Sequence, residues 1–311
     1  MTINILFAAL EARWPQYERP LTAALNAAGV TDFNLSTDIA PQEVDYIVLA
    51  PNGPVQDFSP YTRCKAVLNL WAGVEDVVSN PTLTQPLARM VDHGLTQGMV
   101  EWVTGHVLRH HLGMDTHIHG QDGVWRKVNP PLAQDRPVTI LGLGALGTAC
   151  AEALVALGFD VTGWSRSAKD VPGVRCLNGE SGLRQALGTA QILVLLLPKT
   201  PETENLLNAQ KLALMPEGAF IVNPGRGPLI DDQALLEALD SGHIAHATLD
   251  VFRVEPLPPE HPYWAHPSVT VTPHVASETR EDTASEVIAE NIRRSEAGEP
   301  LLHLVDRDLG Y

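Results

Sequence analysis

Short runs of apolar residues alternate with stretches of helical period along most of this sequence. Helical period is clearest in Leu21–Ala28, Ala145–Leu157 and Asp232–Ser241. Strands that are apolar throughout, rather than at every second residue, are typical of parallel sheets covered by helices on both faces. The sequence therefore predicts an α/β fold. The runs expected to form strands are Ile3–Ala8, Tyr46–Ala50, Ala66–Leu70, Val138–Leu143, Asp160–Trp164, Ile192–Leu197, Ala219–Val222, Ala247–Val251 and Val269–Val271.

Length and charge limit the classes of function. The chain has 311 residues, more than a domain of ordinary size holds, so two domains are expected. Its formal net charge of -16 argues against a nucleic-acid or anionic-membrane partner, because either would be repelled. One basic pocket could still bind an anionic cofactor. No run approaches the roughly 18–20 apolar residues of a membrane span.

The cysteines and the first residues indicate the compartment. Cys64, Cys150 and Cys176 match no close-spaced zinc pattern, and their odd number leaves one without a partner. They are expected to be reduced in a cytoplasmic protein. The run from Met1 to Phe7 has no basic segment before it, so we interpret it as a first core strand and not as a signal peptide.

The most informative local motif opens a helical stretch directly after an expected strand. Residues 142–147 read Gly-Leu-Gly-Ala-Leu-Gly, in which the first glycine permits a tight turn. The second lets the backbone approach a pyrophosphate, and the third lets helix and strand pack closely. Purely structural glycines are the alternative, but the flanking strand and helix favour a dinucleotide site at the helix N-terminus. The residues expected there are Gly142, Gly144, Ala145, Leu146 and Gly147.

The end of the next expected strand indicates which dinucleotide binds. An NAD site usually places Asp or Glu there to bond the ribose 2′-hydroxyl. This chain has Ser165, Arg166 and Ser167 instead. The charge of Arg166 and hydrogen bonds from two hydroxyls suit a 2′-phosphate, although a solvated turn is the alternative. The sequence predicts NADPH as the cofactor, with NADH at lower preference.

Reduction of a carbonyl needs a proton donor and a group that polarises the carbonyl. Arg226 follows an expected strand, where ligands bind in open α/β sheets, and offers a two-pronged fork for a carboxylate. His274 also follows a strand and can donate a proton near neutral pH. A carboxylate such as Glu255 would favour the protonated imidazole. Each could equally be a solvated loop residue, and spacing alone does not join the three.

From Gly142 to His274 the chain resembles the cofactor domain of the D-isomer-specific 2-hydroxyacid dehydrogenases. The glycine loop and four further motifs, in the family's order, carry the resemblance. The four motifs are Leu197–Thr203, Met215–Gly227, Leu249–Pro256 and Thr272–His274. Within the family, residues 163–174 are similar to the glyoxylate/hydroxypyruvate reductase A branch, which uses NADPH. The resemblance implies reduction of a small 2-oxo acid to the 2-hydroxy acid by hydride transfer.

The resemblance also implies a role for each matching residue. Arg226 would bind the substrate carboxylate and carbonyl oxygen, His274 would be the acid/base, and Glu255 would hydrogen-bond it. Backbone N–H groups of residues 71–74 would hold the substrate carboxylate. Those four residues are Trp71, Ala72, Gly73 and Val74. The implied cofactor contacts beyond the glycine and serine loops are Trp164, Leu197, Pro198, Lys199, Thr203, Pro224, Gly225, Asp250 and His274.

Two positions depart from the family's pattern. Pro224 removes an N–H donor beside Arg226. Trp71 stands where smaller residues are common, and its bulk could narrow the pocket or stack on an aromatic substrate. A larger aromatic 2-oxo acid such as phenylpyruvate therefore stays open. A non-enzymatic dinucleotide-sensing corepressor is the alternative from another class, and the complete Arg, Glu and His set disfavours it.

The family's topology is discontinuous. Residues 1–97 and 278–311 would form a smaller flavodoxin-like substrate domain. Residues 98–277 would form a Rossmann-type cofactor domain, a doubly wound parallel sheet, inserted between them. Helices over 97–112 and 278–297 would connect the two. The segment 112–125 would help to form a homodimer.

Four histidines in or near the first connecting helix are candidates for metal ligands. They are His110, His111, His117 and His119. No acidic or cysteine partner stands at a helpful spacing, so we expect no metal site. Positions on a helix surface or in a dimer interface are the preferred interpretation.

Overall fold

The computed structural model describes residues 2–307 and 310, which form two compact units. Unit 1 comprises Met1–Leu95 and Glu278–Tyr311, and unit 2 comprises Thr96–Ser277. The sequence predicts divisions after residues 97 and 277, whereas the units divide after residues 95 and 277. Residues 1, 308, 309 and 311, which belong to the expected substrate domain, lie outside the described residues.

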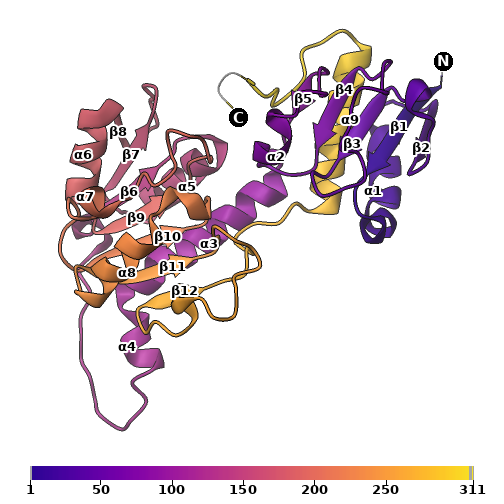
Figure 1. The fold of residues 1–311 in the computed structure, drawn as a ribbon. Helices are drawn as coiled ribbons and strands as arrows, with labels where there is room; N and C mark the ends of the chain where they lie inside the picture. The colour runs from indigo at the N-terminus through magenta and orange to yellow at the C-terminus, as the bar shows by residue number, and fades with distance from the viewer. Residues whose placement is uncertain (1, 308–309, 311) are drawn as a thin grey trace. The chain divides into compact units, whose positions relative to one another are not determined.

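Unit 1 is built on a five-stranded parallel sheet in the order β2-β1-β3-β4-β5. Its strands are β1 (Ile3–Ala8), β2 (Phe33–Ser36), β3 (Tyr46–Leu49), β4 (Ala66–Asn69) and β5 (Leu87–Ala88). Ile5 and Phe7 pack on one face against Leu21 and Ile288, which belong to α1 (Trp14–Ala27) and α9 (Glu281–Glu296). Figure 1 shows these two helices side by side on that face. This strand order is the flavodoxin-like one.

Unit 2 is built on a seven-stranded parallel sheet in the order β12-β11-β10-β9-β6-β7-β8. Its strands are β6 (Val138–Leu141), β7 (Val161–Ser165), β8 (Arg175–Asn178), β9 (Ile192–Leu195), β10 (Ala219–Asn223), β11 (Ile244–Leu249) and β12 (Val269–Val271). From β8 to β11 this is the doubly wound order 3-2-1-4-5-6. The predicted Rossmann-type α/β fold is therefore confirmed.

Helices cover both faces of the unit 2 sheet, as Figure 1 shows. Val103 of α3 (His93–Leu112) and Leu154 of α5 (Ala145–Ala156) pack with Ile140 on one face. On the other face Leu141 packs with side chains of α6 (Gly179–Thr189), α7 (Ala209–Leu212) and α8 (Asp232–Asp240). Adjacent residues of one strand thus enter two different cores, which explains why the strands are apolar throughout. The two remaining short helices are α2 (Glu75–Val78) and α4 (Met114–Ile118).

Every expected strand is present, but three further strands were not anticipated. These are β2, β5 and β8. Both β2 and β8 lie at sheet edges and are only partly buried, so they lack the apolar character that marks central strands. Helix α1 also begins earlier than expected, at Trp14, and contains Pro20. Burial of Tyr17, Leu21 and Leu25 on one helical face outweighs the local cost of the proline.

The expected surface position of the first two histidines is wrong. His110 and His111 are only 3% and 6% exposed. His110 stacks on Phe220 of β10 with ring centroids 4.8 Å apart, and its Nε2 lies 3.0 Å from Thr248 Oγ1. Because α3 lies against the sheet, its last turn buries these rings instead of exposing them. Burial lowers the pKa of His110 to about 3.

The segment after α4 runs without regular structure until a 3-10 turn at Ala133–Asp135. It exposes several large apolar side chains, including Trp125 at 94%. No helix within residues 2–307 combines the length and the apolar character that crossing a bilayer requires.

Candidate active site

The loops at the carboxyl ends of the unit 2 strands carry most of the expected functional residues. Gly142 follows β6, Arg226 follows β10, Asp250 follows β11 and His274 follows β12. Because these strands belong to one parallel sheet, their carboxyl ends lie at the same edge of the sheet. Ligands of open α/β sheets bind at this edge.

The glycine loop has the geometry of a diphosphate site. Gly142 has a φ of +109°, and a Cβ there would lie 2.4 Å from the carbonyl oxygen of Leu196. A Cβ on Gly147 would lie 1.8 Å from the carbonyl oxygen of Gly142. A Cβ on Gly144 would meet nothing within 4 Å, and this exposed residue caps the N-terminus of α5. The residues present therefore fit a dinucleotide, with two glycines packing the turn and one open to the phosphates.

The polar side chains of the turn after β7 differ in burial. The buried Ser165 Oγ donates a hydrogen bond to the carbonyl oxygen of Ser167 at 2.7 Å, so this hydroxyl shapes the turn. Arg166 and Ser167 are exposed. The indole of Trp164 is buried and donates to the carbonyl oxygen of Gly179 at 2.9 Å. Trp164 can therefore face a cofactor only through its backbone.

The loop after β9 is held by its own threonines. Thr203 Oγ1 donates to the carbonyl oxygen of Pro198 and accepts from the N–H of Thr200, both at 2.8 Å. Leu197 is buried, whereas Lys199 is exposed. The structure thus gives Thr203 a role in loop shape and presents Lys199 to solvent.

Arg226 sits on a loop that a buried asparagine organises. Asn223, fully buried at the end of β10, donates from Nδ2 to the carbonyl oxygen of Arg226 at 3.0 Å. Its Oδ1 accepts from the N–H of Gly225 at 3.1 Å. The neighbouring Pro224 is buried, and Arg226 is partly exposed. Sequence reasoning missed Asn223, although a polar residue closing an apolar strand is a signal of this role.

The structure brings His274 and Glu255 together. His274 Nδ1 lies 2.6 Å from Glu255 Oε2, and the N–H of Phe252 donates to Glu255 Oε1 at 2.8 Å. The hydrogen bond to Glu255 raises the pKa of His274, against the opposing effect of partial burial. Burial alone would raise the pKa of Glu255, but the hydrogen bonds from His274 and Phe252 lower it overall. Both shifts favour the imidazolium–carboxylate pair and leave His274 Nε2 as the ring nitrogen that can donate a proton.

Asp250 holds the backbone that presents this imidazole. Asp250 is fully buried, and its carboxylate accepts from Thr272 Oγ1 at 2.6 Å and from the N–H groups of Val275 and Ala276 at 2.9 Å. His274 has a φ of +55°, which is rare for a residue with a side chain. Its N–H donates to the carbonyl oxygen of Asp250 at 2.8 Å. The surrounding bonds therefore maintain a strained backbone conformation at His274.

The expected substrate loop lies in unit 1 and is organised in a similar way. Asn69, 1% exposed at the end of β4, donates from Nδ2 to the carbonyl oxygens of Trp71 and Gly73, both at 2.9 Å. Thr279 Oγ1 donates to the carbonyl oxygen of Leu70 at 2.7 Å. The side chain of Val74 is buried. With two carbonyls bonded inward, the loop's shape is set by Asn69, which sequence reasoning also missed.

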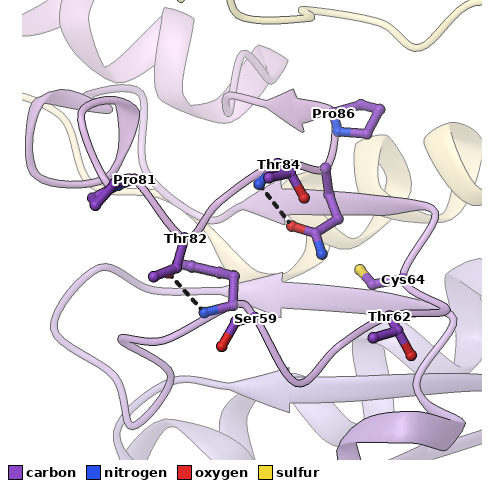
Figure 2. A pocket seen from close by; sticks show the side chains of 9 residues that line it. Ser59, Thr62, Cys64, Pro81, Thr82, Thr84 and Pro86 are labelled. Carbon is purple, nitrogen blue, oxygen red and sulfur yellow. Dashed lines mark hydrogen bonds between the residues drawn. The ribbon is translucent and has the colours of Figure 1, made fainter.

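Unit 1 also has a hollow that other residues line. Its volume is about 710 Å³, and Figure 2 shows hydroxyl and proline side chains around it. Thr82 Oγ1 accepts from the N–H of Phe58 at 3.0 Å. Among the residues that the structure describes, those that line the hollow are uncharged. Among residues 2–307 and 310, no three His, Cys, Asp or Glu side chains are placed to hold a metal ion.

A Rossmann-type sheet with a glycine loop and a paired histidine and glutamate at its strand ends defines a dinucleotide-dependent oxidoreductase domain. The chain belongs to the D-isomer specific 2-hydroxyacid dehydrogenases. The family's NAD binding domain matches residues 104–276. This establishes the family for more than half of the chain.

Three relatives cover most or all of the chain. Glyoxylate/hydroxypyruvate reductase A of Serratia proteamaculans is 41% identical over 257 residues, which are 80% of this chain and 82% of that protein. A D-isomer specific 2-hydroxyacid dehydrogenase from Xanthobacter autotrophicus Py2, solved with NADPH and MES, is 41% identical with a TM-score of 0.94. An NADPH-dependent glyoxylate/hydroxypyruvate reductase from Sinorhizobium meliloti, solved with NADP and sulfate, is 35% identical with a TM-score of 0.87. Both structural comparisons cover 100% of each chain.

Proposed function

We propose that this protein uses NADPH to reduce a small 2-oxo acid, such as glyoxylate or hydroxypyruvate, to the 2-hydroxy acid. The observation that carries the proposal is the His274–Glu255 pair, 2.6 Å apart, at the sheet edge that also bears Arg226. Membership of the dehydrogenase family supports it. The names of the relatives from Serratia and Sinorhizobium point to the same substrates.

The cofactor proposal rests on two loops of unit 2. The open side of Gly144 and the N-terminus of α5 would hold the diphosphate. The exposed Arg166 and Ser167 would hold the 2′-phosphate, with a guanidinium charge and a hydroxyl. The complexes of the Xanthobacter and Sinorhizobium proteins with NADPH and NADP support this preference.

The chemistry follows from charge and geometry. Bound NADPH supplies the hydride that the carbonyl carbon receives. Arg226 binds the substrate carboxylate and stabilises the negative charge that develops on the carbonyl oxygen. His274 donates the Nε2 proton to that oxygen, and Glu255 stabilises the imidazolium beforehand. Backbone N–H groups of residues 71–74 are proposed as further donors to the substrate carboxylate.

Trp71 favours a second candidate substrate. Its side chain is 38% exposed at the start of the proposed substrate loop. An indole in this position offers a flat apolar surface on which an aromatic ring can stack. A larger aromatic 2-oxo acid such as phenylpyruvate is therefore the second candidate, with the same proton donor and the same cofactor.

The test is the loss of NADPH absorbance with each of three oxo acids, glyoxylate, hydroxypyruvate and phenylpyruvate, and with NADH in parallel. We expect the highest kcat/KM with NADPH and one of the two small acids. A preference for phenylpyruvate would select the second candidate. No turnover of any acid with either cofactor would refute the proposed function.

We further propose a homodimer in the cytoplasm. The segment from Leu112 to Trp125 exposes large apolar side chains, which suits a surface that a second copy covers. Cys64, Cys150 and Cys176 are free thiols, as a reducing compartment favours. Sedimentation equilibrium tests the dimer, and a mass equal to one chain would contradict it.

A further inference from the structure

Arg253 fastens the turn that carries Glu255 to the chain that follows Arg226. Its Nη2 donates to the carbonyl oxygen of Ile230 at 2.6 Å and also to Asn205 Oδ1. Its Nε lies 3.3 Å from Asp232 Oδ2 at the start of α8. The side chain is 30% exposed, so these contacts are partly shielded from water. One guanidinium therefore joins its own turn to acceptors in two other segments, one at Asn205 and one at Ile230 and Asp232.

Asp232 extends this network to the far end of the same loop. The hydroxyl of Tyr263 donates to Asp232 Oδ1 at 3.0 Å, while Oδ2 faces Arg253. Tyr263 is only 3% exposed, and this burial raises its pKa. The loop between residues 253 and 263 is thus anchored at both ends to one carboxylate. Glu255 lies within that loop, two residues after Arg253.

Backbone packing brings the same two segments together beside Arg253. A Cβ on Gly227 would lie 2.0 Å from the carbonyl carbon of Phe252, so only glycine allows this approach. The N–H of Phe252 donates to Glu255 Oε1 at 2.8 Å. Gly227 directly follows Arg226. Arg226, which is proposed to bind the oxo acid, and Glu255, which pairs with His274, are therefore connected through the contact between Gly227 and Phe252.

We propose that Arg253 is a positioning residue, which holds Glu255 against His274 while keeping both in place relative to Arg226. The inference rests on the proposed function, since it assigns Arg253 a part in the same reduction. Arg253 itself contacts neither the reacting atoms nor His274. Without its guanidinium, the turn keeps the backbone bond to Glu255 but loses its anchors to Ile230 and Asp232.

The pKa of His274 depends on where Glu255 is held. The charged groups that act on it are Glu255, Arg226 and Asp250. The hydrogen bond and the charge of Glu255 raise the pKa of His274, Arg226 lowers it, and Asp250 raises it. Movement of Glu255 away from the imidazole should therefore lower this pKa.

The experiment compares Arg253→Met with Arg253→Lys and the unaltered enzyme. Arg253→Met keeps the aliphatic stem and removes every donor, and we expect kcat for the oxo acid to fall about tenfold or more. The pH profile of kcat/KM should shift to lower pH, with KM for NADPH unchanged. Arg253→Lys should restore part of both effects, because an ammonium can reach Asp232 but lacks the spread of donors with which a guanidinium bonds two segments at once.

Arg293→Met is the matched control, since Arg293 bonds Glu290 and Glu299 in unit 1 through a similar set of donors. It should leave kcat and the pH profile unchanged. A lower melting temperature of Arg253→Met with unaltered kcat and pH profile would overturn the inference, because it would mean a purely structural role. Nuclear magnetic resonance titration of His274 in both proteins measures the same change in pKa without turnover. If the proposed function is wrong, the unaltered enzyme shows no turnover. If only the inference is wrong, the unaltered enzyme is active and Arg253→Met keeps its kcat and pH profile.

Discussion

Each unit ends a strand of its parallel sheet on a buried asparagine that organises the following loop. Asn69 in unit 1 uses Nδ2 twice, on the carbonyl oxygens of Trp71 and Gly73. Asn223 in unit 2 uses both ends of its amide, on Gly225 and Arg226. For Asn69 Oδ1, the part of the chain that the structure describes offers no hydrogen-bond donor.

The two loops nevertheless offer different chemistry. The unit 1 loop presents backbone and a tryptophan, whereas the unit 2 loop presents the guanidinium of Arg226. Unit 2 also carries the His274–Glu255 pair at its strand ends. An asparagine at a strand end thus shapes both a loop of backbone and tryptophan and a loop that presents a guanidinium. Which of the two results depends on the side chains that follow it.

The largest expected effect tests whether a residue of unit 2, His274, is the proton donor. His274→Ala should lower kcat by about 10²- to 10⁴-fold, because it removes the proposed general acid. Fluorescence titration should show NADPH binding nearly unchanged. The unaltered enzyme should lose activity as the pH rises through the pKa of His274, which Glu255 holds above its ordinary value of about 6.5. Unchanged turnover in His274→Ala would refute the assignment.

The next effect concerns the cofactor, which we assign to unit 2 only. Arg166→Asp should reduce the preference for NADPH over NADH by about 10- to 100-fold, because a charge-assisted bond to the 2′-phosphate is replaced by repulsion. The ratio of kcat/KM for the two cofactors measures it. Arg19→Asp, on the exposed side of α1 in unit 1, is the control and should not alter the ratio. An unaltered ratio in Arg166→Asp would contradict the assignment of the 2′-phosphate to this turn.

The two asparagines themselves give the third prediction. Asn223→Ala should cost about 1–3 kcal/mol of unfolding free energy, since the buried N–H of Gly225 loses its acceptor and the carbonyl oxygen of Arg226 loses one of its donors. It should mainly lower kcat, through displacement of Arg226. Asn69→Ala should cost less, because it also removes an unsatisfied Oδ1, and should mainly raise KM for the oxo acid. Asn34→Ala, at an exposed position, is the control, and equal effects of both variants on kcat would contradict the division.

The smallest expected effect is the dependence of the stability of unit 2 on pH. Burial lowers the pKa of His110 to about 3 and that of His246 to about 4, and both rings lie in unit 2. An unfolded histidine has a pKa near 6.5, so below that pH the unfolded state binds more protons and unfolding becomes easier.

Each such histidine should therefore cost up to about 1.4 kcal/mol per pH unit below about 6.5. His110→Asn should weaken the fall of the melting temperature between pH 7 and pH 5, as calorimetry would show. The fall depends on the balance around His110, where Arg109 and His106 oppose protonation and Asp115 favours it. His117→Asn, at an exposed position, should change nothing, and an equal change there would contradict the prediction.

The sequence predicted the central strands, the glycine loop and the residue types of the acid–base pair. Central strands of parallel sheets are apolar on both faces, so composition alone marks them. The edge strands β2 and β8 escaped detection because one side of each has no neighbour and its residues are only partly buried. The family resemblance joined Arg226, Glu255 and His274, which spacing could not do.

Some assignments depended on contacts between distant segments. Trp164 and Ser165 stand beside the proposed phosphate site in sequence, yet their polar atoms bond within the protein. Asp250 is surrounded by the backbone that presents His274. His110 is buried because α3 lies on the sheet. Apart from the bond of Ser165 to Ser167, these placements join residues far apart in the chain, so no pattern of neighbouring residues could reveal them.

By itself, therefore, the sequence determined the α/β class and the dinucleotide loop, because periodicity and turn chemistry are local properties. The choice of Arg226, Glu255 and His274 as proposed catalytic residues came from the family resemblance. The tertiary structure alone decided that His274 Nδ1 lies 2.6 Å from Glu255, and that Asn223 and Asn69 shape their loops. It also decided that Arg253 fastens three segments together. Hydrogen bonds between residues far apart in the chain form only once strand order and helix packing have set their distances, and the pKa values of the reactive groups follow from those distances.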